Sequence, residues 1–174
     1  MTQKYNIYLD DVRTPTANEW VVVRSYDEFV AKINELGFDN IEHISLDHDL
    51  GETAMAEYYN GIKNYALNYD NIKEKTGLDC AKWLVDEFYN VHPEYLEMDR
   101  GSKKRTTPYF PFPHVYVHSA NPIGSANMVG YINNYFKNCK TPQTCIRVEI
   151  KHTIDESHHL SPDARKAKWD RTNK

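Results

Sequence analysis

Three short, largely apolar runs in this chain each end directly at a group of polar, chemically reactive residues. The runs cover residues 4–9, 43–46 and 115–117 and have the length and composition of strands. The polar groups that follow are Asp10-Asp11, Asp47-His48-Asp49 and His118-Ser119. Parallel strands joined by right-handed crossovers end at the same edge of a sheet. The sequence therefore predicts that the three groups meet at one edge and form a ligand site.

Helical patterns lie between these strands. The three predicted helices cover residues 25–37, 76–88 and 123–139. The first begins with Ser25 and Glu28 at the spacing of a capping box and ends at Gly37, as a C-cap glycine would. In the second, Thr76 precedes Asp79 by three residues, which is also typical of a helix start.

Two further strands are predicted, a buried one at residues 20–23 and one at residues 146–150. The second alternates apolar and charged residues, which indicates a sheet edge. Alternating strands and helices predict an α/β domain over residues 1–154, with a mainly parallel sheet of about five strands covered on both faces, a three-layer sandwich.

Two long insertions, residues 52–75 and 92–112, are expected to be loops, either functional lids or disordered. The first is rich in Tyr and Asn; it could stack a nucleobase or cover the core. The polar tail, residues 155–174, lacks periodicity, which leaves a folded or a mobile tail open.

The charge balance, 25 acidic against 21 basic residues, excludes an extended cationic surface for duplex nucleic acid. No stretch has the ~18 apolar residues of a membrane span, and no signal peptide is evident, so a cytoplasmic protein is expected. Three cysteines without C-x-x-C spacing predict neither a disulfide framework nor a zinc site. A homo-oligomer is left open.

Converging carboxylates repel one another by roughly 4 kcal/mol per pair at ~4 Å and an effective dielectric of ~20, so some are protonated or a cation lies among them. All-oxygen ligation favours Mg²⁺ or Mn²⁺. The predicted ligands are Asp10, Asp11, Asp47 and Asp49. Asp47 is also a candidate nucleophile. Asp10 and Asp11 could instead form a turn, and Asp49 could be a turn residue before Gly51.

Other residues near this edge could act on a phosphate. His118 and His48 are candidate general acid and base, although either could be a hydrogen-bonded bystander. Ser119 could contact a phosphoryl oxygen, and Asn121 could cap the third helix, whose N-terminus favours anions. Arg13 could bind a phosphate or form a salt bridge to Asp10 or Asp47.

The ordered motifs resemble a known family. They are Leu9-Asp10-Asp11-Val12-Arg13-Thr14-Pro15, Trp20 with Val23-Arg24-Ser25, Ser45-Leu46-Asp47-His48-Asp49-Leu50-Gly51, Gly77-Leu78-Asp79, and His118-Ser119-Ala120-Asn121 with Met128. Together they resemble the cyclic-phosphate processing receiver-like domains. The resemblance implies a flavodoxin-like fold, a Mg²⁺ site and processing of 2′,3′-cyclic RNA ends or cyclic nucleotides. It also implies that Lys151 stands for the lysine of ordinary receivers and Ser119 for their switch hydroxyl. The chain departs from receivers in its reduced first helix.

Three functions are considered. The first is a metal-dependent phosphoesterase that opens a cyclic phosphate, in RNA repair or in a phage–bacterium conflict over nucleotide signals. The Asn-, Lys- and Tyr-rich composition is compatible with an AT-rich phage genome. The second is a signalling receiver phosphorylated on Asp47. The third is a non-catalytic module that sequesters a cyclic nucleotide.

Overall fold

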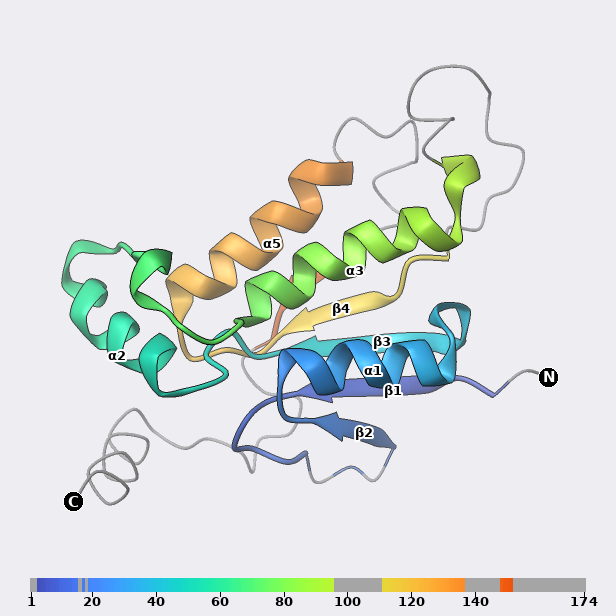
Figure 1. Ribbon diagram of the computed structural model, residues 1–174, viewed down its shortest axis with the longest axis horizontal. Helices are drawn as coiled ribbons and strands as arrows, with labels where there is room; N and C mark the ends of the chain where they lie inside the picture. Colours follow the sequence, from blue (N-terminus) through green and yellow to red (C-terminus); the bar gives the residue numbers. More distant parts are fainter. Residues whose placement is uncertain (1–2, 16, 18, 96–110, 137–147, 152–174) are drawn as a thin grey trace.

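The computed structural model describes residues 3–15, 17, 19–95, 111–136 and 148–151 (Figure 1). Five parallel strands form one sheet in the order β2-β1-β3-β4-β5. The strands are β1 (Tyr5–Leu9), β2 (Trp20–Val23), β3 (Ile41–Leu46), β4 (His114–Val117) and β5 (Val148–Ile150). The predicted five-stranded parallel sheet is confirmed, and so is the edge position of β5. β2 is the other edge strand and is only partly buried, because none of the described strands lies beyond it to cover its outer side.

The three predicted helices are present at their predicted places between the strands, and one further helix is present that was not predicted. The helices are α1 (Tyr26–Leu36), α2 (Glu52–Gly61), α3 (Gly77–Val91) and α5 (Pro122–Phe136), with short 3-10 turns η1 (Phe38–Asn40), η2 (Ile62–Asn64) and η3 (Tyr69–Asn71). Between β1 and β2 none of the described residues is helical, which agrees with the predicted reduction of the first helix.

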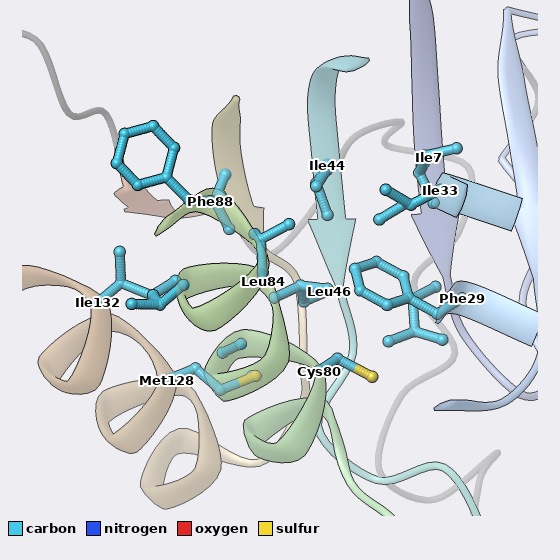
Figure 2. Packing of buried hydrophobic residues seen from close by; sticks show 14 of the residues in the cluster. Ile7, Phe29, Ile33, Ile44, Leu46, Cys80, Leu84, Phe88, Met128 and Ile132 are labelled. Carbon is cyan, nitrogen blue, oxygen red and sulfur yellow. The ribbon is translucent and has the colours of Figure 1, made fainter. Parts of the chain in front are cut away.

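One face of the sheet carries the hydrophobic core. The strand residues on this face include Ile7, Leu9, Val23, Ile44, Leu46, Val115 and Val117. They pack against α1, α3 and α5, which contribute Phe29, Leu84 and Ile132 (Figure 2). Side chains alternate along a strand, so Tyr8, Ser45 and Tyr116 point to the opposite face. The third layer that a sandwich needs on that face is not found among the described residues.

The helix ends are fixed by the residues that the sequence indicates. The Ser25 hydroxyl accepts a hydrogen bond from the Glu28 backbone N–H, although the Glu28 carboxylate accepts from Arg24 rather than from Ser25. Gly37 ends α1 with φ of 82°, a conformation that glycine adopts at little cost. Thr76 and Asp79 form a full capping box at the start of α3.

The first insertion is not a loop. It contains α2, η2 and η3, which lie beyond the carboxyl ends of the strands (Figure 1). The sequence pattern misses α2 because only Ala54 and Glu57 of that helix are buried. Carboxylates hold the segment instead. Glu74 accepts from the Ala54 backbone and the Thr53 hydroxyl, and Glu57 accepts from the Asn68 backbone.

The predictions for the second insertion, residues 92–112, and for the tail, residues 155–174, concern segments that lie largely outside the described residues. Residues 96–110 and 152–174 are not described. Ile146, Cys139 and Cys145 also fall outside the described residues. Within the described part of the chain, none of the helices has the length and apolar character that a membrane span requires.

Candidate functional site

Three predicted site residues lie side by side at the carboxyl edge of the sheet. Asp10, Asp47 and His118 each follow the last residue of a strand, and their backbone N–H groups extend the ladder by one step. Asp47 donates to the Leu9 carbonyl over 2.9 Å, and His118 donates to the Leu46 carbonyl over 3.0 Å. Leu9 and Leu46 point into the core, so the residues that follow them turn to the opposite face. All three are buried.

Asp10 is held by Arg13 and by the turn between them. Its Oδ1 accepts from the backbone N–H groups of Val12 and Arg13, and its Oδ2 accepts from Arg13 Nε. The Asp10 side chain is fully buried, whereas the Arg13 side chain keeps 11% of its surface exposed. The salt bridge that the sequence left as one role for Arg13 is therefore present.

The same guanidinium reaches Asp47. Arg13 Nη2 donates to Asp47 Oδ2 over 2.8 Å, and Asp47 Oδ1 accepts from the His48 backbone N–H over 2.9 Å. Arg13 thus bridges two carboxylates that come from adjacent strands. The repulsion that the sequence predicts between converging carboxylates is offset by an arginine of the chain itself.

His118 completes the group that we call the Arg13 cluster: Asp10, Arg13, Asp47 and His118. Its Nε2 lies 3.1 Å from Asp10 Oδ2, and its Nδ1 lies 2.7 Å from the Ser45 hydroxyl. Its ring stacks on Tyr8 with the ring centres 4.4 Å apart. Because an ionised carboxylate only accepts, this arrangement places a proton on Nε2 and lets Nδ1 accept from Ser45.

Burial and charge act in opposite directions within the Arg13 cluster. Burial alone would raise the pKa of Asp10, but the hydrogen bond from His118 and the charge of Arg13 outweigh it and hold that pKa well below its ordinary value. Burial would lower the pKa of Arg13, but the charges of Asp47 and Asp10 raise it above its ordinary value. Asp10 is therefore ionised and Arg13 is protonated at neutral pH.

Arg24, at the end of β2, fixes the loop that carries the Arg13 cluster. Its guanidinium donates to the backbone carbonyls of Asp10 and Arg13 and to the Thr14 hydroxyl. Arg24 belongs to one of the family motifs of the sequence, but no role was predicted for it. A role for Arg24 in the site could have been inferred from its position directly after β2, at the same edge of the sheet as Asp10.

A second group of polar residues lies beside the first and centres on His48. His48 Nδ1 lies 2.7 Å from Asp49 Oδ1, and His48 Nε2 lies 3.0 Å from the Tyr69 hydroxyl. Asn121 also donates to Asp49 Oδ1, over 3.0 Å. The predicted metal ligand Asp49 thus contacts His48 and Asn121, and its carboxylate is not part of the Arg13 cluster.

Tyr69 is a site residue that was not predicted from the sequence. It comes from the first insertion, and its hydroxyl accepts from Asn127 of α5 over 2.9 Å. Burial raises the pKa of Tyr69, so the phenol is protonated and donates to His48 Nε2. His48, a candidate acid or base, is fully buried and bonded at both ring nitrogens. No local pattern marks Tyr69 among the other tyrosines of the insertion.

The remaining predicted residues are placed as follows. Asn121 caps α5, because its Oδ1 accepts from the backbone N–H groups of Ile123 and Gly124. The Ser119 hydroxyl is buried and accepts from the Asn121 backbone N–H. Lys151 is exposed, with its Nζ 4.6 Å from the centre of the Tyr116 ring.

The donor set of the Arg13 cluster is chemically suitable for a divalent cation. Asp10, Asp47 and His118 each offer one ligand atom, and these atoms lie within 4.8 Å of one another. Two carboxylates and an imidazole fit Mn²⁺ better than Mg²⁺, which prefers oxygen ligands alone. Asp11, which is half-buried, does not belong to this set of three.

The sheet order, the acidic residues after β1 and β3 and the His-Ser pair after β4 define a receiver-like α/β domain with a flavodoxin-like fold. The chain belongs to the family of cyclic-phosphate processing receiver domains, whose profile matches residues 5–134. The match covers the whole Arg13 cluster but not Lys151. Neither the curated proteins nor the solved structures contain a match to this chain.

Proposed function

We propose that this protein is a phosphoesterase that opens a cyclic phosphate on a nucleotide or on an RNA end. The observation that carries this proposal is the Arg13 cluster, in which an arginine, two carboxylates and a histidine meet at the carboxyl edge of a parallel sheet. Ligands of open α/β sheets bind at this edge. The family description, which names the processing of cyclic phosphates, agrees with it.

In the proposed reaction water adds to phosphorus, and the bond from phosphorus to one ring oxygen breaks. The freed oxygen ends with a proton, so the product is a phosphomonoester. Arg13 would bind the phosphoryl oxygens, since a guanidinium pairs well with phosphate. The attacking water supplies that proton, because His118 would be a ligand of a divalent cation in this site; Asp10 and Ser45 fix the orientation of its ring.

A divalent cation, Mg²⁺ or Mn²⁺, is part of this proposal. Asp10, Asp47 and His118 would hold it, and when bound it would polarise the phosphoryl oxygens. The second group, centred on His48, would support this arrangement because the His48 backbone N–H holds Asp47 Oδ1.

A second candidate is a module that binds a cyclic nucleotide without turning it over. One observation favours it: both ring nitrogens of His118 and of His48 are bonded to groups of the protein. A histidine in that state must lose a partner before it can exchange a proton with a substrate.

The two candidates are separated by one experiment. The purified protein is incubated with 2′,3′-cyclic nucleotides, cyclic-phosphate-ended RNA and cyclic dinucleotides, with Mg²⁺, with Mn²⁺ and with EDTA. The variants His118→Ala and Asp47→Asn are compared with the control His92→Ala. His92 lies away from the Arg13 cluster and pairs with Asp39, a residue of η1.

Ring opening that is lost in the first two variants and kept in His92→Ala supports the esterase. Calorimetric binding of one ligand without turnover supports the binding module. Neither binding nor turnover on any ligand of the panel contradicts both.

A further inference from the structure

The carboxylate of Asp10 already accepts four hydrogen bonds. Oδ1 accepts from the backbone N–H groups of Val12 and Arg13, and Oδ2 accepts from Arg13 Nε and from His118 Nε2. An ionised carboxylate offers about four lone-pair positions. A further ligand of Asp10 must therefore displace one of these donors.

The partner carboxylate is engaged in a similar way. Asp47 Oδ2 accepts from Arg13 Nη2 over 2.8 Å, and Asp47 Oδ1 accepts from the His48 backbone N–H. A divalent cation binds carboxylate oxygens at about 2.0–2.2 Å, which is closer than any hydrogen-bond donor lies. The guanidinium and the cation also carry charges of the same sign. Both cannot occupy the space between the two carboxylates at once.

We propose that Arg13 is the built-in counter-ion of this site and that a divalent cation binds to Asp10, Asp47 and His118 only after Arg13 has left. This deepens the proposed function by stating how the predicted cation reaches its position. It also gives Arg13 two alternative partners, the carboxylates in the described state and the phosphate once the cation is bound.

Such an exchange requires only the side chain of Arg13 to move, while the backbone of its loop stays in place. Arg24 and Asp10 Oδ1 hold the backbone of residues 10–13 through bonds that do not involve the Arg13 guanidinium. The guanidinium uses one Nε–H and one Nη–H on the carboxylates. Its other three N–H groups have no partner among the described residues, so they can meet a phosphate as the side chain leaves.

The proposal is tested by titrating Mn²⁺ without any phosphate compound and following binding by electron paramagnetic resonance. The variant is Arg13→Gln, and Arg13→Met is a second one, with an apolar side chain of the same length as glutamine, in case the first does not fold. Lys32→Gln is the matched control, since it also removes one positive charge but from α1, where Lys32 pairs with Glu35. Circular dichroism checks the folding of each variant.

We expect Arg13→Gln to bind Mn²⁺ at least tenfold more tightly than the unaltered chain, and Lys32→Gln to bind as the unaltered chain does. Adding Asp47→Asn to Arg13→Gln should remove the gain, which locates the cation in the Arg13 cluster. Equal or weaker binding in both Arg13 variants overturns the proposal, and so does a gain that survives Asp47→Asn. The readout is binding alone, so a failure of the proposed esterase activity leaves this result unaffected.

Discussion

Gly124 lies where α5 passes closest to the His48 ring. A Cβ added at Gly124 would lie 2.2 Å from His48 Cγ and 2.5 Å from its Cδ2, whereas carbon atoms pack at about 3.5–4.0 Å. The His48 ring cannot easily yield, because it is fully buried and bonded to Asp49 and Tyr69. The substitution Gly124→Ala must therefore move the ring, the helix or both.

The expected size of the effect follows from three contributions. Alanine in place of glycine within a helix gains about 0.5–1 kcal/mol. Overpacking costs about 1–3 kcal/mol, and loss of the His48 hydrogen bond to the Asp49 carboxylate adds about 1.5–3 kcal/mol. Together these give an expected fall in the free energy of unfolding of about 1.5–5.5 kcal/mol for Gly124→Ala.

Gly130 of the same helix is the matched control. A Cβ added there meets nothing within 4 Å, so Gly130→Ala should raise the free energy of unfolding by about 0.5–1 kcal/mol. Urea denaturation at pH 7 gives both values, provided that the free energy of unfolding falls with urea concentration at the same slope in the two variants. If Gly124→Ala proved as stable as Gly130→Ala, the packing of His48 against α5 described above would be refuted.

Three further predictions concern the Arg13 cluster, the start of α3 and the buried thiol of Cys80. The pKa of Asp10 is lower in the folded chain than the ~3.9 of an unfolded aspartate, so its stabilising contribution is complete above that value and is lost as the pH falls below it. Urea denaturation at pH 7 and pH 3 should show a smaller loss of stability in Asp10→Asn than in the unaltered chain; an equal loss would contradict the assignment. Thr76→Ala removes half of the capping box of α3 and should cost about 0.5–2 kcal/mol in the same assay, while no cost would mean that the box does not stabilise the helix. Cys80 is fully buried and its pKa is raised, chiefly by burial, so iodoacetamide should label it only after unfolding. Peptide mass spectrometry measures the labelling, and a labelled Cys80 in the folded protein would contradict this prediction.

The regular elements could largely be predicted from the sequence. Strands and helices with a buried face follow from the period of their apolar residues, and the caps at Ser25, Thr76 and Asn121 follow from side chains that bond to neighbouring N–H groups. Helix α2 could not be predicted in this way. Few of its residues are buried, and carboxylates distant in the sequence hold it in place.

The sequence by itself determined which residues reach the carboxyl edge of the sheet, because strand ends and right-handed crossovers leave few alternatives. Only the tertiary structure decided how these residues pair. Asp47 and Asp49 are two positions apart and would share a face in a strand, but the chain leaves β3 at Leu46, and the two carboxylates bind Arg13 and His48 respectively. Which carboxylate an arginine or a histidine contacts depends on side-chain torsions and on neighbours brought together by folding, and no local pattern encodes these.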